Sequence, residues 1–340
     1  MITYHLQPPP AQREGGLEAA IQGLCGALRG AGVTVEMELP EKFQAGSVVH
    51  LHGLWQRAWP AAARRCRAEG VPYVVSPHGM LEPWAWRHKW WKKWPYFYAI
   101  ERGMLRGASA LLATAQDEAD RIHARVPGPR VEAIPLGLSG DARPNYIGAR
   151  AQLGWATEEK ILLFLSRLHP KKGLELLLEG LSRLSPTWAA HGLRLVVVGD
   201  GAPEYVRYLH DFAAARAAKL PPIDWIGPVW GDARWPYFQG ADLFCLPTYS
   251  ENFGLAVLES LQVGTPVLTT SATPWGSQLH PPKGYICEPH IDSVTHALEQ
   301  FLRLASAPLN ERERLSEWAI ARFSWKNLIN DYLALYSSLL

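Results

Sequence analysis

The chain has 340 residues, of which 48% are hydrophobic and 19% charged. This length and composition predict about two globular domains with substantial cores and exclude an intrinsically disordered chain. The formal net charge of +2 argues against a general nucleic-acid-binding protein. Four scattered cysteines without a CxxC pair favour reduced thiols and a cytoplasmic location. We expect neither a secretory signal nor a membrane span.

The chain begins with an expected strand over residues 1–6, which prolines 8–10 interrupt. Gly15 and Gly16 then lead into a helix with an apolar face made of Leu17, Ile21, Leu24 and Leu28. Two glycines before a helix permit close approach of the backbone to a ligand. A plain loop is an equally good interpretation of this turn.

Two further strands are expected over residues 33–39 and 47–51. His50 and His52 lie near the end of the second strand and share one face of it, because side chains alternate along a strand. A metal-binding pair is one interpretation. A structural role is favoured, because no third ligand stands at a recognisable spacing.

The next apolar run, residues 71–76, continues into Ser76-Pro77-His78-Gly79. An imidazole at the end of a buried strand can hydrogen-bond to a ligand hydroxyl or respond to a nearby charge. It can equally be a satisfied structural group. His78 is therefore a candidate site residue.

A basic, tryptophan-rich segment spans residues 84–106. Between residues 87 and 106, six lysines or arginines accompany one acid, Glu101. The interleaved tryptophans are Trp84, Trp86, Trp90, Trp91 and Trp94. One interpretation is peripheral contact with an anionic membrane, because tryptophan and long basic side chains suit the lipid–water interface. The other is a helix that buries its aromatic side chains, and Pro95 is expected to begin a further helix.

Strands over residues 110–114 and 131–135 complete the first half, and a polar connection follows over 139–148. The second half begins with a fully apolar strand, 160–165, which is typical of a parallel sheet covered on both faces. Arg167 and Lys172 follow it and precede a leucine-striped helix. Basic residues at this position lie where open α/β sheets bind ligands.

The strand expected over 194–198 ends in a Gly199-Asp200-Gly201 turn. The strand expected over 223–227 contains Ile226. Residues 241–246 form another apolar strand, and strand 266–270 lies beyond the next helix. Strands alternating with helices through both halves predict two doubly wound sheets.

The segment TYSENFGLAVLESLQVG, residues 248–264, combines a tight loop with a helix that Gly254 opens. We expect Ser250, Glu251 and Asn252 to supply capping groups. The exposed N–H groups of a helix N-terminus favour a phosphate or a developing anion. Glu251 and Glu259 stand about two helical turns apart, so they can hold two ends of an extended ligand.

SENFGLAVLES, with Gly-Thr-Pro-Val behind it, resembles the signature of the retaining glycosyltransferase family 4. SPHGMLEPWA, SRLHPKKGLELL and the Phe323-Ser324-Trp325 ending resemble further segments of that family. The resemblance implies the GT-B fold, in which two Rossmann-like domains face a central cleft. It further implies an acceptor-side domain over residues 1–150, a nucleotide-sugar-binding domain over 151–320 and a helix, 321–340, that returns to the first domain.

The resemblance implies roles for single residues as well. Arg167 and Lys172 would hold the donor phosphate, and His78 would lie beside the sugar. Glu251 would bind sugar hydroxyls, and Glu259 would bind the ribose. The other implied donor-binding residues are Gly15, Gly16, Gly199, Gly201, Ile226, Asn252, Phe253, Gly254 and Leu255.

We therefore expect a retaining transferase that moves a sugar from a nucleoside diphosphate to a glycan or lipid-linked acceptor, without a metal or other cofactor. Cell-surface polysaccharide or lipopolysaccharide synthesis at the inner face of the cytoplasmic membrane is the expected setting. The alternatives are a non-catalytic nucleotide-sugar-binding protein and an epimerase or hydrolase of the same fold. A nucleic-acid partner is not expected.

Overall fold

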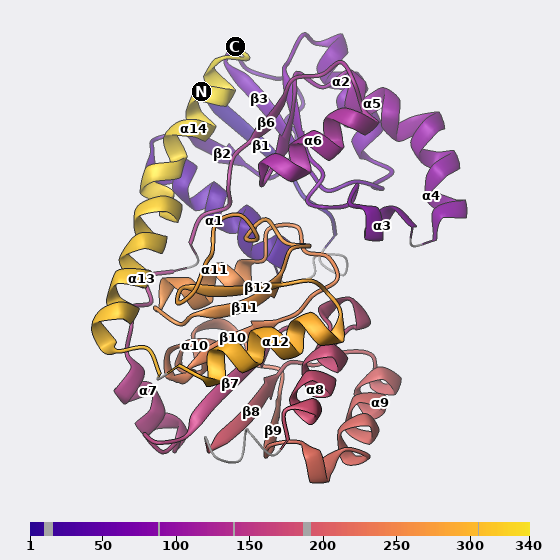
Figure 1. The fold of residues 1–340 in the computed structure, drawn as a ribbon. Helices are drawn as coiled ribbons and strands as arrows, with labels where there is room; N and C mark the ends of the chain where they lie inside the picture. The colour runs from indigo at the N-terminus through magenta and orange to yellow at the C-terminus, as the bar shows by residue number, and fades with distance from the viewer. Residues whose placement is uncertain (10–15, 88, 139, 186–191, 305) are drawn as a thin grey trace. The chain divides into compact units, whose positions relative to one another are not determined.

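The computed structural model describes residues 1–9, 16–87, 89–138, 140–185, 192–304 and 306–340. The chain forms two compact units, one made of Met1–Ser139 with Arg322–Leu340 and the other of Gly140–Ala321. Each unit contains a six-stranded, fully parallel sheet flanked by helices (Figure 1). This architecture confirms the predicted α/β fold with two Rossmann-like sheets.

The sheet of the first unit has the strand order β2-β1-β3-β4-β5-β6. Its strands are β1 (Ile2–Leu6), β2 (Thr34–Glu36), β3 (Ser47–His52), β4 (Tyr73–Ser76), β5 (Ala110–Ala113) and β6 (Val131–Ala133). Its helices are α1 (Gly16–Gly30), α2 (Trp59–Ala68), α3 (Pro83–Arg87), α4 (Trp90–Tyr96), the π-helix η2 (Phe97–Glu101), α5 (Arg102–Arg106), α6 (Gln116–Arg125) and α14 (Trp325–Ser337).

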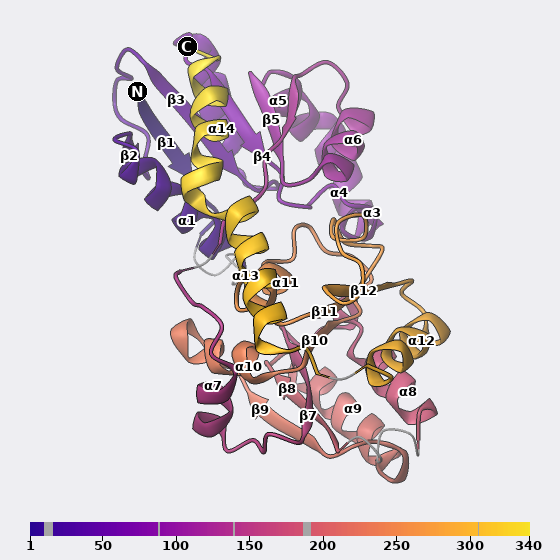
Figure 2. The same cartoon turned by 60° about the vertical axis from the view of Figure 1, so that its left-hand side comes forward.

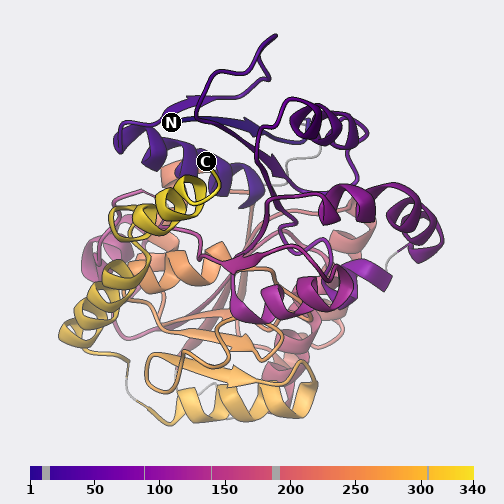
Figure 3. The ribbon, with the colours of Figure 1, turned by 90° about the horizontal axis from the view of Figure 1, so that it is seen from above.

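Alternating side chains of this sheet build two separate cores. Val49 and Val75 face the helices that follow β3 and β5, whereas Val48 and Val74 face α1 and α14. All three ribbon views show α14 alongside α1 (Figures 1, 2 and 3). The aromatic side chains of α14 thereby complete the second of these cores.

The first residue of α14, Trp325, packs against two glycines of the same unit. A Cβ atom added to Gly23 would lie 2.8 Å from Trp325 Nε1, and one added to Gly137 would lie 2.4 Å from the indole ring. The absence of side chains at these two positions therefore makes room for the indole.

The sheet of the second unit has the order β12-β11-β10-β7-β8-β9. Its strands are β7 (Lys160–Leu165), β8 (Leu193–Val198), β9 (Ile223–Gly227), β10 (Leu243–Leu246), β11 (Val267–Thr270) and β12 (Gly284–Cys287). Its α-helices are α7 (Tyr146–Leu153), α8 (Leu174–Arg183), α9 (Pro203–Ala214), α10 (Trp235–Gly240), α11 (Leu255–Gln262), α12 (Ile291–Leu302) and most of α13 (Leu309–Phe323). Its short 3₁₀-helices are η3 (Pro170–Lys172), η5 (Ala217–Lys219) and η6 (Gly231–Arg234).

The helices of this unit form two groups in Figures 1 and 2. Helix α8 packs against α9 and α12, and helix α10 packs against α7 and α11. The inner strands β7, β8 and β10 are largely apolar, as the run over residues 160–165 predicts for a sheet covered on both faces.

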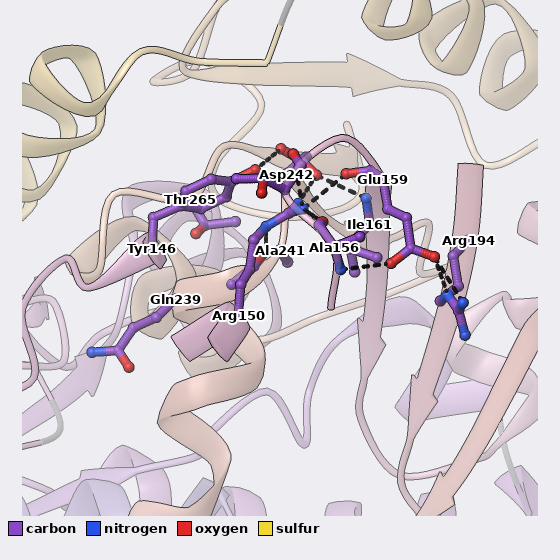
Figure 4. Close-up of polar contacts among 12 residues, drawn as sticks. Tyr146, Arg150, Ala156, Glu159, Ile161, Arg194, Gln239, Ala241, Asp242 and Thr265 are labelled. Atoms are coloured by element: carbon purple, nitrogen blue, oxygen red, sulfur yellow. Dashed lines mark hydrogen bonds and ion pairs between the residues drawn. The ribbon is translucent and has the colours of Figure 1, made fainter. Parts of the chain in front are cut away.

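A buried ionic network joins α7 to this sheet (Figure 4). The Arg150 guanidinium pairs with the Asp242 carboxylate, which also accepts hydrogen bonds from the Tyr146 hydroxyl at 2.8 Å and the Ile161 N–H at 2.8 Å. Arg312 donates to the Thr265 hydroxyl at 3.0 Å. Since Asp242 precedes β10 and Ile161 is the second residue of β7, the network lies at the amino ends of the strands, opposite the edge where such sheets bind ligands.

Three sequence expectations about local structure need correction. Strand β2 spans three residues rather than 33–39, because it is an edge strand whose only partner among the described strands is β1. Strand β12 was not predicted. Pro95 lies inside α4 rather than at the start of a helix. The chain passes from α4 directly into the π-helix η2, whose wider turn suits a segment in which proline lacks an N–H donor.

Candidate active site

The strand order of the second unit reverses between β7 and β10. In an open parallel sheet, loops that leave two neighbouring strands in opposite directions open a crevice at their carboxyl ends, and ligands bind there. The loop after β7 carries Arg167 and Lys172, and the loop after β10 carries Glu251 and Phe253. The fold thus brings the four predicted donor-binding residues to a single edge.

A glycine positions Lys172 at this edge. Gly173 has a φ of +72°, and a Cβ atom on it would lie 2.0 Å from the carbonyl oxygen of Pro247. Only glycine allows the loop after β7 to pass this close to the end of β10. The same approach lets the Lys171 carbonyl accept hydrogen bonds from the Tyr249 N–H at 2.8 Å and the Thr248 hydroxyl at 2.9 Å.

Lys172 and Glu251 form an ion pair across the crevice. The ammonium nitrogen lies 2.5 Å from Glu251 Oε2, and the two side chains are 15% and 14% exposed. Burial acts to raise the pKa of the Glu251 carboxyl, but Lys172, Lys171 and the Asn252 N–H outweigh it and lower the pKa below 4.5. Glu251 is therefore a carboxylate at neutral pH, and the edge presents a fixed cation and a fixed anion side by side.

Helix α11 points its N-terminus toward the same loop. Gly254, with a φ of +79°, is the N-cap residue, and no side chain among the described residues caps the helix. The N-cap residue is thus Gly254 itself and none of Ser250, Glu251 and Asn252. The left-handed turn at Gly254 carries the chain into the helix in place of a side-chain cap. Trp275 holds the turn by donating from Nε1 to the Phe253 carbonyl at 2.6 Å.

Glu259 lies further along α11 and has a partner that the sequence did not suggest. Arg234 Nη2 lies 2.9 Å from Glu259 Oε1, and the guanidinium stacks 4.4 Å from the centre of the Trp235 ring. No motif or spacing connects residue 234 with residue 259, because the contact depends on how η6 packs beside α11. Arg234 is a functional candidate found only from the structure.

Leu255 is the first residue of α11, and the remaining predicted residues of this unit lie at the ends of β8 and β9. A Cβ atom on Gly199 would lie 1.9 Å from the Ser166 carbonyl oxygen, and one on Gly201 would lie 2.0 Å from that of Leu168. These glycines let the turn after β8 pack against the loop that carries Arg167. Ile226, in β9, is 42% exposed.

In the first unit, His78 follows β4 with a φ of +49°. The buried Glu118 carboxylate supports this loop: it accepts hydrogen bonds from the Gly79 N–H at 2.7 Å and from the Thr114 N–H at 2.8 Å. Sequence analysis did not identify Glu118. Gly16 is the first residue of α1, whereas Gly15 lies outside the described residues.

His5 joins His50 and His52 in a buried cluster, at the carboxyl ends of β1 and β3. One ring nitrogen of each lies within 4.8 Å of the others. The third histidine stands at no recognisable spacing in the sequence, and it joins the pair because β1 lies in register beside β3. A cavity of about 10 Å³, lined in part by His50, His52 and His78, lies beside the cluster. It offers room for about one water molecule.

Two family models match the chain: one described as glycosyl transferases group 1 over residues 148–322, and one described as a glycosyl transferase 4-like domain over residues 41–137. The chain belongs to the glycosyl transferases group 1 family. The match confirms the resemblance seen in SENFGLAVLES and SRLHPKKGLELL.

Among curated relatives of this glycosyltransferase family member is a D-inositol 3-phosphate glycosyltransferase of Mycobacterium bovis, 28% identical over 255 residues. The alignment covers 69% of this chain and 50% of the relative, so the chain spans about half the length of the curated relatives it matches.

Two solved structures share the fold of this family member. HepE of Anabaena, solved in complex with UDP and glucose, has a TM-score of 0.77 and 17% identity, with 99% and 100% of the two chains covered. WaaG, described as a glycosyltransferase involved in lipopolysaccharide biosynthesis, has a TM-score of 0.72 and 15% identity, with 99% of each chain covered. At these identities the likeness concerns the GT-B fold.

Proposed function

We propose that the protein transfers a sugar from a nucleoside diphosphate to an acceptor hydroxyl, with retention of the anomeric configuration. The observation that carries this proposal is the Lys172–Glu251 pair at the β7/β10 crevice, beside the N-terminus of α11. A nucleotide sugar has an anionic diphosphate next to a hydroxyl-rich ring. At this edge Lys172 offers a cation for the diphosphate, and Glu251 offers a hydrogen-bond acceptor for the sugar hydroxyls. HepE, with its UDP and glucose complex, supports the same donor class.

The chemistry assigns each group a separate task. Cleavage of the sugar–phosphate bond increases the negative charge on the departing nucleoside diphosphate. Arg167, Lys172 and the first N–H groups of α11 stabilise that charge, and loss of one such group typically costs about 3 kcal/mol of barrier. Glu251 accepts hydrogen bonds from sugar hydroxyls. Glu259, oriented by Arg234, accepts them from the ribose.

Retention and independence of metal complete the proposed mechanism. Retention is supported by family membership, and the departing phosphate accepts the proton of the acceptor hydroxyl on the face it leaves. The cations named above supply the charge stabilisation that a metal would otherwise provide. Transfer that persists in excess EDTA, with a product of unchanged anomeric configuration by NMR, is the expected result. Loss of activity in EDTA that Mg²⁺ restores would contradict the metal-independent scheme.

A ligand panel tests the donor site. Thermal shifts are measured with UDP, GDP, ADP, dTDP and their common sugar conjugates, because a ligand at a hundred times its Kd stabilises the protein by about 2.7 kcal/mol. One nucleotide class is expected to raise the melting temperature of the wild type but not of Lys172→Ala. The control is Arg183→Ala, which removes a basic side chain from an exposed ion pair with Asp292 in the same unit.

Product analysis then separates transfer from its alternatives. The nucleotide that binds is supplied as its sugar conjugate with and without glycan acceptors, and the products are separated by chromatography. We expect sugar on the acceptor and the free nucleoside diphosphate in equal amounts, and none of either from Lys172→Ala or Glu259→Ala. Full turnover in both variants, or a folded protein that binds no nucleotide sugar, would refute the proposed function.

We place the acceptor at the inner face of the cytoplasmic membrane, as a lipid-linked or growing cell-surface glycan. The tryptophan-rich segment supports this: Trp90, Trp91 and Trp94 are 51%, 58% and 42% exposed, beside lysines 89, 92 and 93. Trp86, in contrast, is buried against Phe97. WaaG, with its part in lipopolysaccharide synthesis, supports the same setting.

Vesicle flotation tests the membrane contact. No described helix is long and apolar enough to cross a bilayer. The wild type is expected to float with vesicles rich in anionic lipid, and Trp90→Ala/Trp91→Ala is expected to remain at the bottom of the gradient. Trp230→Ala, which alters a 74% exposed tryptophan elsewhere, is the matched control. A wild type that never floats would refute the contact.

A further inference from the structure

Four histidines gather at one edge of the first sheet. Its strand order reverses between β1 and β3, which makes this the ligand-binding edge by the rule applied above to the second unit. His5 lies near the end of β1, His50 and His52 near the end of β3, and His78 just after β4. Only His78 was assigned a role from the sequence. The other three lie behind it, fully buried.

Three of these rings form a hydrogen-bonded string that ends at His78. His5 Nδ1 lies 3.0 Å from His52 Nε2, and His52 Nδ1 lies 3.1 Å from His78 Nε2. The planes of successive rings are inclined to each other by 19° and 22°, and the ring centroids of each pair lie 5.3 Å apart. This arrangement aligns the N–H of one ring with the lone pair of the next, as a hydrogen bond requires.

Each ring in the string carries a single N–H. Burial lowers the pKa of His5 to about 3 and that of His78 to about 4, and it lowers the pKa of His52 well below 6.5. All three imidazoles are therefore neutral at pH 7, with one donor and one acceptor nitrogen each. Once the protonated nitrogen of one ring is known, each neighbouring ring has to supply the opposite group at their shared contact. The tautomers of the other two rings are then determined.

The environment of His5, at the buried end of the string, determines which way the hydrogen bonds run. His5 Nε2 is buried and has no hydrogen-bond partner among the described residues. If Nε2 carried the hydrogen, a buried N–H would be orphaned, and orphaned N–H groups are rarer in folded proteins than unsatisfied acceptors. The hydrogen therefore lies on His5 Nδ1, which donates to His52 Nε2. His52 then donates from Nδ1 to His78 Nε2.

We infer that His5 and His52 are positioning residues that hold His78 in the Nδ1–H tautomer, so that this edge presents a hydrogen-bond donor to the ligand. The side chain of His78 is half-buried, and no described residue hydrogen-bonds to its Nδ1. A hydroxyl oxygen of a bound sugar is the acceptor that matches this N–H. That last step rests on the proposed function, whereas the tautomer itself does not.

His50 belongs to the cluster but not to the string. Its ring stacks on the face of His52, with centroids 4.0 Å apart, and its nitrogens contact the Tyr336 hydroxyl at 2.7 Å and the Ser76 hydroxyl at 2.7 Å. A hydroxyl can either donate or accept, so neither neighbour fixes the tautomer of His50. Replacement of His50 is therefore expected to leave the direction of the string unchanged.

The test is a nitrogen-15 NMR spectrum of histidine-labelled, ligand-free protein at pH 7. Protonated and unprotonated ring nitrogens differ widely in chemical shift, and single replacements assign the signals. The expected spectrum of the wild type shows His5, His52 and His78 each protonated at Nδ1 alone. In His52→Leu, which removes the donor to His78 Nε2, His78 is expected to show both tautomers, and in the control His50→Gln it is expected to keep the wild-type signals.

Three outcomes would overturn the inference. One is a wild-type spectrum with His78 protonated at Nε2, which is decisive even if the variants fail to fold. The second is a folded His52→Leu protein in which His78 is unchanged. The third is stoichiometric zinc in the purified protein whose removal alters the histidine signals, because the cluster would then be a metal site.

Enzyme kinetics provide a second, independent test once the sugar donor and the sugar acceptor are known. His52→Leu, which removes a buried side chain behind His78, is expected to lower kcat/KM about ten-fold, as the loss of one hydrogen bond would. The expected spectrum without any sugar transfer would confirm the tautomer and refute the proposed function, so the two failures are distinguishable.

Discussion

Glu101, in the π-helix of the first unit, is expected to oppose folding as the pH rises. Its Oε1 accepts a hydrogen bond from the Trp55 N–H at 2.7 Å, whereas its Oε2 is buried and unpaired among the described residues. Burial raises the pKa of this carboxyl from 4.5 to about 7, and the Trp55 N–H offsets part of the effect. Because the pKa is higher in the folded state, stability from this group is greatest below pH 4.5 and declines as the pH approaches 7.

The structure gives the size of the effect. The difference between 4.5 and about 7 corresponds to about 3.4 kcal/mol of unfolding free energy, at 1.36 kcal/mol for each pH unit. Glu101→Gln keeps an oxygen for the Trp55 N–H and removes the charge. We expect the unfolding free energy of the variant to exceed that of the wild type by about 3 kcal/mol at pH 8 and by about 2 kcal/mol at pH 6. At pH 4.5 the two unfolding free energies are expected to differ little.

Scanning calorimetry from pH 4.5 to 8.5 measures this difference. At roughly 2–4 °C for each kcal/mol, the variant is expected to melt about 6–12 °C higher at pH 8 in the transition of the first unit. Buried neutral histidines destabilise every protein compared as the pH falls below 6.5, so their contribution cancels. Glu36→Gln, which alters an exposed carboxyl on β2, is the control. A wild type and variant that differ equally at pH 4.5 and pH 8 would refute the reasoning.

Three other replacements have defined outcomes. Arg150→Leu leaves the buried Asp242 carboxylate without its guanidinium and is expected to cost about 3–5 kcal/mol of stability by chemical denaturation; an unchanged midpoint would contradict this. Gly173→Ala places a Cβ against the Pro247 carbonyl and is expected to lower nucleotide-sugar affinity measured by calorimetry, whereas Gly26→Ala, with open space around it, should have no such effect. Glu118→Gln removes one acceptor from the His78 loop and is expected to lower the melting temperature by the equivalent of about 1–3 kcal/mol; wild-type stability would argue against that support.

Local patterns predicted most of the fold. The apolar run of β7 and the leucine stripe of α8 identify their elements because both are buried in ways that sequence periodicity records. Strand β12 was missed because four residues, Gly284–Cys287, carry little periodicity of their own. That segment is a strand because β11 supplies its hydrogen-bond partners. The sequence of residues 284–287 alone does not show this pairing.

The candidate site was predictable one residue at a time, but its pairings were not. Lys172 and Glu251 each belong to a recognisable motif, yet their ion pair joins residues 79 apart and depends on β7 lying next to β10. Arg234 belongs to no motif, and its role follows only from its contact with Glu259. His5 is 47 residues from His52. In each case the missing information is which strands and helices are neighbours.

Helix α14 has a consequence for the order in which the chain can fold during synthesis. Its residues Ile329, Tyr332, Leu335 and Tyr336 fill a core whose other buried side chains come from the first 140 residues, with the whole second unit in between. During synthesis, α1 therefore covers only part of this face of the first sheet, and the entire second unit is made before α14 completes the cover. The second unit can fold as it emerges, whereas the first has to wait. A nascent chain halted before Trp325 is expected to remain bound to chaperones through the exposed face of α1.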